Sequence, residues 1–189
     1  MAGKSCQLVW MMASPDSQGA WEETPPAWDG RDAPTSLARY AEWLNRRARL
    51  TFLQAGTHVE LFFMLRPDGQ AGLGAPPPGY DRDQLAAALR EAIRANDIYG
   101  LVHICEAWTY LPRKPRDHTF TQLVQGEMTV SELQPEDRTE ALMVRMESRD
   151  GAHRLWISPI LRREGGADLG EPIDITDPPA GRFAGLFQP

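Results

Sequence analysis

Cysteine is scarce in this chain of 189 residues. Its two cysteines, Cys6 and Cys105, lie far apart, and no C-x-x-C pair occurs. Two such thiols supply neither a disulfide framework nor a zinc knuckle, and they are typical of proteins from a reducing compartment. We therefore predict a cytoplasmic location.

Long apolar runs are missing as well. The segment Cys6–Ala13 is apolar but spans only about eight residues, the lower end of a signal-peptide core. A single lysine precedes it, and no A-x-A cleavage pattern follows. No segment approaches the ~20 apolar residues that span a bilayer. We expect a soluble protein without a membrane partner.

An excess of positive charge is also lacking, because the formal net charge is -6. Nonspecific nucleic-acid binding needs clustered lysine and arginine to neutralise phosphates. One local exception places Arg113, Lys114 and Arg116 between Tyr110 and Phe120. This basic and aromatic mixture is found in single-strand binding sites. Acidic residues soon follow it, so we interpret it as a solvated loop and do not expect nucleic-acid binding.

The strong enzyme motifs are absent from the sequence. It contains no G-x-G-x-x-G, G-x-x-x-x-G-K-[ST], G-x-S-x-G or H-E-x-x-H pattern. These motifs cradle phosphates, expose a nucleophile or hold zinc. Their absence predicts no bound cofactor. It does not exclude an enzyme, because catalytic residues can be scattered along a chain.

The composition is that of a globular protein, with 42% hydrophobic and 24% charged residues. A chain of this length fits one domain. We divide it into a loop-like arm over residues 1–34, an α+β domain over 35–163 and a C-terminal tail over 164–189. The arm carries Trp10, Trp21 and Trp28. These rings indicate that it packs against the domain or a partner.

Apolar periodicity predicts two helices and four main strands. The helices begin at Ser36 and, with Asp81 as N-cap, at residue 82. The strands cover residues 58–65, 101–110, 140–148 and 154–162, the last two joined by an Asp150-Gly151 hairpin turn.

These elements favour an α+β fold with a mostly antiparallel sheet of about four to six strands and two helices packed on one face. Within that sheet, one possible arrangement makes strands 58–65 and 101–110 a parallel pair joined right-handedly through the second helix. Residues 70–79 are expected to form an exposed loop. Residues 111–137 form a long loop that contains short strands at 120–124 and 128–133, and loops of this length are often functional.

The best candidate for a chemical site lies on the first two strands. His58 and Glu60 come from one strand, and His103, Cys105 and Glu106 from the next. Imidazole, thiolate and carboxylate groups suit zinc or a similar metal. The alternative is that His58 is solvent-facing and that Cys105 is a small buried apolar residue.

Glu106 also has two interpretations. Strand alternation places it with apolar residues and near Trp108, where burial would raise its pKa and suit a general acid. Alternatively, it lies at the rim of the sheet and pairs with Arg138, Arg145 or Arg162.

Four short patterns carry a resemblance to known sequences. They are Glu106-Ala-Trp108, Pro135-Glu-Asp-Arg138-x-Glu-Ala-Leu142, Asp150-Gly151 and Pro159-Ile-Leu-Arg162. Together they resemble a group of small uncharacterised bacterial and phage-borne proteins over roughly residues 58–162. The resemblance implies a fold unit and no chemistry. It selects Trp108, Arg138, Glu140 and Arg162 as candidate binding residues beside Glu106.

Two hypotheses about function follow. The first is a noncatalytic binding or accessory domain that contacts another protein or self-associates through an exposed sheet face or edge. The second is a small hydrolase or metal-dependent enzyme that uses Glu106 with His103 and His58.

Overall fold

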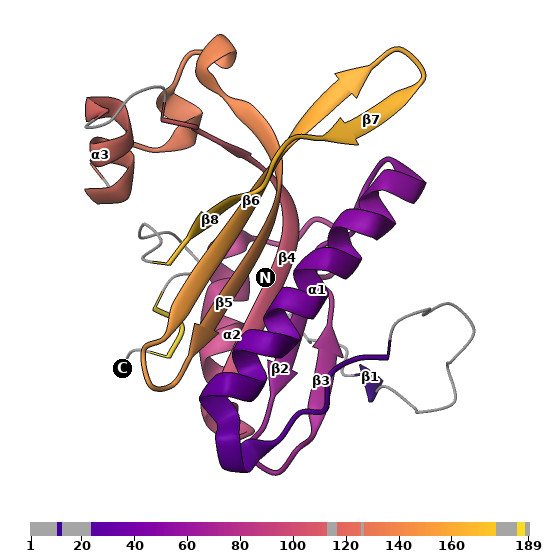
Figure 1. The fold of residues 1–189 in the computed structure, drawn as a ribbon. Coiled ribbons are helices and arrows are strands. Elements are labelled where there is room, and N and C mark those ends of the chain that lie inside the picture. Colours follow the sequence, from indigo (N-terminus) through magenta and orange to yellow (C-terminus); the bar gives the residue numbers. More distant parts are fainter. Residues whose placement is uncertain (1–10, 13–23, 113–116, 126, 177–184, 188–189) are drawn as a thin grey trace.

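The computed structural model describes residues 11–12, 24–112, 117–125, 127–176 and 185–187. Within them, the chain forms an antiparallel sheet of eight strands together with three α-helices (Figure 1). The predicted α+β class and antiparallel sheet are confirmed. None of the described helices is both long and apolar enough to cross a bilayer.

The helices are α1 (Ala33–Ala55), α2 (Arg82–Ala95) and α3 (His118–Gln125). The strands are β1 (Met11–Met12), β2 (Leu61–Leu65), β3 (Ala71–Gly74), β4 (Gly100–Thr109), β5 (Thr139–Ser148), β6 (His153–Arg163), β7 (Gly166–Leu169) and β8 (Ile173–Ile175). Short 3-10 turns occupy Gly30–Asp32, Val130–Glu132 and Pro135–Asp137.

The strand order is β1-β3-β2-β4-β5-β6-β7, with β8 on β6, and every pair is antiparallel. β4 lies at the centre. It pairs with β5 along its whole length but with β2 only as far as the Leu61–Ile104 pair. The second half of β4 therefore extends beyond β2.

The predicted parallel pairing of the first two main strands is wrong, because β2 and β4 are antiparallel neighbours. The reason is strand β3, which lies in the segment expected to be a loop. Since β3 and β4 both pair antiparallel with β2, they run parallel to each other, and α2 connects them across β2. Two of the four residues of β3 are glycines, which are depleted in strands and typical of loops.

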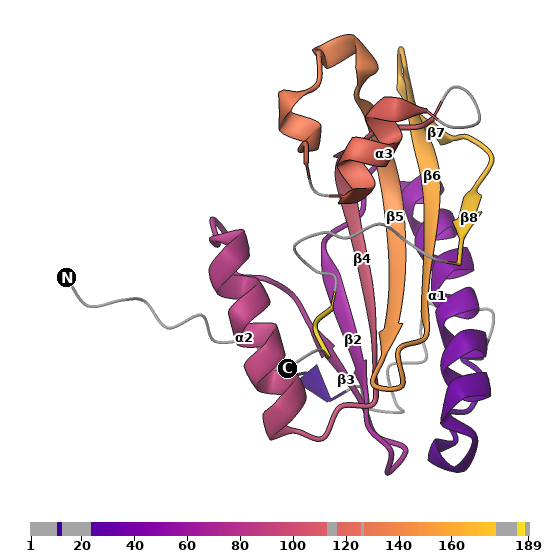
Figure 2. The ribbon, with the colours of Figure 1, turned by 90° about the vertical axis from the view of Figure 1, so that its left-hand side faces the viewer.

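The helices differ from the prediction in their placement, because α1 and α2 lie on opposite faces of the sheet (Figure 2). Buried side chains of α1 pack against Val102, Ile104 and Val144. Those of α2 pack against Phe62 and Leu101. We call these the α1 face and the α2 face. Because β2 and β4 carry apolar residues on both sides, both faces require a cover.

Local signals set the ends of these elements as expected. The α1 helix ends at Gly56, whose φ of 73° is favourable for glycine and whose N–H donates to Phe52 O at 2.7 Å. The carboxylate of Asp81 accepts from the backbone N–H groups of Asp83 and Gln84, which caps α2. Gly151 adopts a φ of 85° in the β5–β6 hairpin.

The short strands expected at 120–124 and 128–133 are not formed. Helix α3 and the 3-10 turn Val130–Glu132 occupy these positions. The buried carboxylate of Asp117 accepts from Phe120 N at 3.3 Å and from the Tyr110 hydroxyl at 2.8 Å. Asp117 thereby favours the start of α3 at His118, because an N-terminal carboxylate satisfies otherwise unpaired N–H groups.

The segments on either side of the predicted domain also contact the sheet. Trp28 Nε1 donates to Arg66 O at 2.5 Å, and its ring lies 5.9 Å from that of Tyr99. This agrees with an arm that packs through a tryptophan, whereas Trp10 and Trp21 lie outside the described residues. Beyond residue 163, β7 and β8 extend the sheet, and Leu186 is buried against α2.

Candidate functional site

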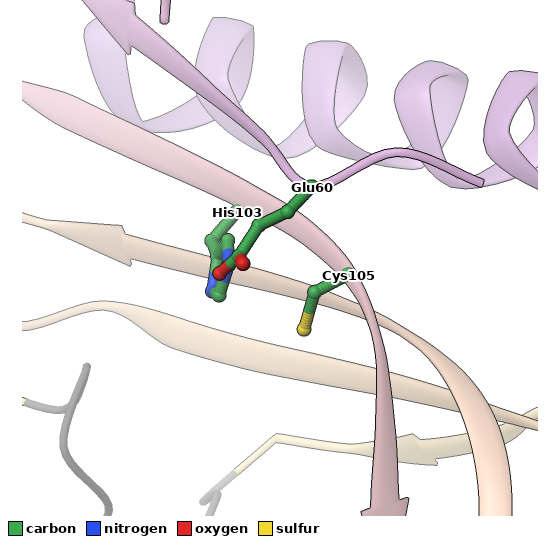
Figure 3. Close-up of side chains that lie close together, drawn as sticks. All are labelled: Glu60, His103 and Cys105. Atoms are coloured by element: carbon green, nitrogen blue, oxygen red, sulfur yellow. The ribbon is translucent and has the colours of Figure 1, made fainter. Parts of the chain in front are cut away.

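A glutamate, a histidine and a cysteine meet on the α2 face (Figure 3). His103 and Cys105 alternate along β4, so both side chains point to this face. Glu60 comes directly before β2 and reaches the same place from the neighbouring chain segment. One potential ligand atom from each residue lies within 4.8 Å of the other two.

The imidazole of His103 is held firmly in this cluster. Its Nε2 lies 2.8 Å from Glu60 Oε1, and the Tyr80 hydroxyl donates to the other oxygen of the same carboxylate. The ring stacks on Phe62 with centroids 4.3 Å apart, and only 5% of His103 is exposed. Packing and hydrogen bonding thus fix the orientation of the ring.

Charge and burial act against each other at these groups. Burial alone would lower the pKa of His103, but its interactions with Cys105 and its hydrogen bond to the Glu60 carboxylate raise it to about 9. Burial also tends to raise the pKa of Glu60, yet the bonds from His103 and Tyr80 outweigh it and lower that pKa. Burial and the bond to Glu60 raise the pKa of Tyr80 to about 12. The cluster therefore favours an ionised carboxylate beside a protonated imidazole.

This residue set can hold a metal ion. Zinc binds thiolate sulfur at about 2.3 Å and imidazole nitrogen or carboxylate oxygen at about 2.0–2.2 Å. Three protein ligands would leave a fourth tetrahedral position open, as in catalytic rather than structural zinc sites. A metal would displace the proton shared by His103 and Glu60, because imidazole must be neutral to bind it.

The two other members of the predicted constellation lie elsewhere. Glu106 projects from the α1 face, where it accepts from Thr57 Oγ1 at 2.9 Å, from His58 N and from Arg162 Nη2 at 3.3 Å. The imidazole Nδ1 of His58 lies 2.6 Å from Val59 O. Glu106 thus has the rim position and arginine partner of the second interpretation. It does not converge with His103.

Arg162 joins three elements at the end of α1. Its guanidinium donates to both carboxylate oxygens of Glu140 at 2.9 and 2.6 Å and to Gly56 O at 2.9 Å. It also lies 5.8 Å from the Phe52 ring centroid. These contacts connect β6 with β5 and with the end of α1.

The other two candidate binding residues have different surroundings. Arg138 donates to Leu133 O and Ser131 O, so it supports the 3-10 turns before β5. Trp108 is 59% exposed on the part of β4 that extends beyond β2. It is therefore available for contacts outside the described chain.

Sequence reasoning did not select Tyr80 or Arg145 for this cluster. Tyr80 precedes α2, and no sequence motif around it predicts its hydrogen bond to Glu60. Arg145 lies directly opposite His103 in the β4–β5 register and shares its face. The alternation of β5 predicts which residues share a face with Arg145. Only the pairing register between β4 and β5 shows that His103 lies on that same face. The basic residues Arg113, Lys114 and Arg116 lie outside the described residues.

The fold and the cluster together define an α+β protein with a mixed carboxylate, imidazole and thiol site on one sheet face. No family model, curated protein or solved structure matches this chain. The resemblance to small bacterial and phage-borne proteins therefore stays a prediction.

Proposed function

We propose that this protein binds a divalent metal ion of the zinc class through Glu60, His103 and Cys105. The observation that carries the proposal is the approach of three different ligand types to within 4.8 Å on one sheet face. Nitrogen and sulfur ligands favour zinc over magnesium and calcium, which prefer oxygen. Cys105 is a free thiol, which supports a reducing, cytoplasmic environment.

The arrangement supports a role for the metal beyond structure. With three protein ligands, the open position would accept water or a ligand group. Zinc lowers the pKa of a bound water to about 7, which would allow hydrolytic chemistry without Glu106 or His58. In the metal-dependent hypothesis, the Glu60 carboxylate therefore replaces Glu106 as the acidic residue of the site.

Zinc titration of the purified, chelator-treated protein tests this proposal. We expect one zinc ion per chain, measured by elemental analysis after equilibrium dialysis. His103→Gln and Cys105→Ser should each weaken binding by about 100-fold or more, because ligand loss exceeds the 10- to 100-fold effect of outer residues. His58→Gln is the matched control and should leave binding unchanged. Wild-type protein that retains no zinc would refute the proposal.

A noncatalytic binding domain that self-associates remains a second proposal, favoured by a separate observation. Trp108 and Val59 are 59% and 68% exposed near the part of β4 that has no β2 partner. An exposed apolar strand edge is a template for pairing with a second copy. Sedimentation of wild type should show a concentration-dependent dimer that Trp108→Lys abolishes. A wild-type protein that stays monomeric at every concentration would contradict this proposal.

A further inference from the structure

A half-buried arginine lies beside the Glu60, His103 and Cys105 cluster. Arg145 is the register partner of His103 on β4 and of Leu155 on β6. Partners of this kind have Cβ atoms about 5 Å apart and project from the same face. The guanidinium therefore originates on the α2 face, next to the imidazole ring.

The charge of Arg145 is poorly compensated. Its side chain makes no hydrogen bond or ion pair with any residue that the structure describes, and its Nε is buried without a partner. Burial lowers the pKa of Arg145, and Glu147 opposes this effect only through its charge. The Glu147 carboxylate accepts from the backbone of Phe187 and Leu186, while its Oε2 is buried without a hydrogen-bond partner.

A half-buried guanidinium whose Nε is buried without a hydrogen-bonded partner costs free energy, so its presence needs a reason. Two of its neighbours along β5 and β6, Met143 and Leu155, are apolar and offer no acceptor in their side chains, and the third, Glu147, interacts with Arg145 through its charge but forms no hydrogen bond to it. A planar guanidinium binds carboxylate and phosphate groups through two parallel bonds, and such bonds strengthen where water is excluded. An anion from outside the described chain would satisfy these donors.

We propose that Arg145 binds the anionic group, a carboxylate or a phosphate, of a small ligand that also reaches the open metal position at His103 and Cys105. The metal contact of this ligand rests on the proposed zinc site. The Arg145 contact does not, because it depends only on the half-buried guanidinium and its register. The metal would hold one end of the ligand, and Arg145 would select for negative charge at the other.

Calorimetric titration with inorganic phosphate and with succinate tests the inference on both zinc-loaded and zinc-free protein. We expect wild type to bind at least one of the two anions, and the comparison identifies which anionic group is preferred. Arg145→Met should weaken that binding by about 10- to 100-fold, as loss of a charge-assisted pair does. Arg145→Lys should retain part of it. Arg149→Met, which alters an exposed arginine paired with Asp97, is the control and should bind like wild type.

The same variants separate this inference from the zinc proposal. If zinc does not bind but the zinc-free protein binds the anion through Arg145, the inference stands and the zinc proposal fails. If neither anion binds wild type in either state, or if Arg145→Met binds as tightly as wild type, the inference is overturned. Thermal melting of Arg145→Met should show no loss of stability, because the substitution removes a half-buried cation that has no hydrogen-bonded partner among the described residues. Arg145→Lys gives a second measurement should the methionine variant fold poorly.

Discussion

At the scale of single residues, His103 shows how partners decide the charge of a buried group. Burial disfavours the imidazolium ion, yet interactions with Cys105 and with the adjacent carboxylate of Glu60 favour it more. The same groups that hold a proton on His103 are the proposed metal ligands. Proton and metal therefore compete for one site.

This competition predicts a pH dependence of stability in the metal-free protein. The folded-state pKa of His103 is about 9, above its ordinary value of 6.5. The stabilisation of the folded state by protonated His103 is therefore fully present below about pH 6.5 and is lost as the pH rises through 9. We expect the free energy of unfolding to fall by about 3 kcal/mol across this interval, measured by urea denaturation.

Glu60→Gln is the control for this dependence. Without the carboxylate, burial should act with less opposition, and the pKa of His103 should fall. Nuclear magnetic resonance titration of the His103 ring reports this pKa directly. An unchanged His103 pKa in the variant would show that Glu60 does not stabilise the imidazolium ion.

At the scale of elements, the N-terminal arm approaches the β2–β3 turn very closely at Gly30. A Cβ atom built on Gly30 would lie 1.7 Å from Pro67 O, a backbone atom that cannot rotate away. We expect Gly30→Ala to displace the arm and lower the free energy of unfolding by about 1–3 kcal/mol.

Gly166→Ala is the matched control, because a Cβ atom there meets nothing within 4 Å. Its stability should stay within about 0.5 kcal/mol of wild type. Equal stability of the two variants in urea denaturation would show that the arm does not pack on the turn as described.

The Arg162 network provides a second prediction at this scale. Arg162→Ala would remove the bidentate contact with Glu140 and leave Glu106 with one donor fewer. We expect a lower melting temperature, and a smaller difference from wild type at high salt because exposed ion pairs are screened.

Arg163→Ala is the control for the network. Arg163 is mostly exposed, and its only described ion-pair contact, to Asp168, spans 3.7 Å. Its replacement should leave the melting temperature nearly unchanged. An Arg162→Ala melting temperature no lower than that of Arg163→Ala would mean that the network does not stabilise the end of α1.

At the scale of the whole molecule, the C-terminal segment contributes to the core. Leu186 is 2% exposed and packs in the cluster that joins α2 to β2 and β4. We expect Leu186→Ala to cost about 2–4 kcal/mol in urea denaturation, as other buried leucine truncations do. Leu161→Ala, at a position 41% exposed, should cost much less. Equal costs would place Leu186 outside the core.

The sequence predicted those elements of the fold that have strong local signals. The apolar stripe of α1, the Asp81 cap and the Asp150-Gly151 turn each reflect interactions between residues close in the chain. The missed features depend on distant contacts. The glycine-rich β3 is a strand because β2 and β1 pair with it. The helices α1 and α2 lie on opposite faces of the sheet because both faces carry apolar residues that must be covered. The apolar periodicity of one helix does not show which face of the sheet that helix covers.

The site was predictable to a similar extent. Alternation correctly grouped His103 with Cys105, and Glu60 was among the candidates. The same alternation places Glu106 on the opposite face, so its grouping with His103 was wrong on the sequence alone, whereas the position of His58 depended on the unknown register between β2 and β4. Arg145 joins the cluster because β5 pairs with β4, and Tyr80 joins it because it lies just before α2. Neither relation can be predicted from the residues close to them in the sequence.

X-ray absorption at the zinc edge tests the central claim most directly. Zinc-loaded protein should show one sulfur neighbour at about 2.3 Å and nitrogen or oxygen neighbours at about 2.0–2.2 Å. Cys105→Ser should lose the sulfur shell, whereas His58→Gln should keep it. A wild-type spectrum without sulfur in the first shell would contradict the metal site proposed at Glu60, His103 and Cys105.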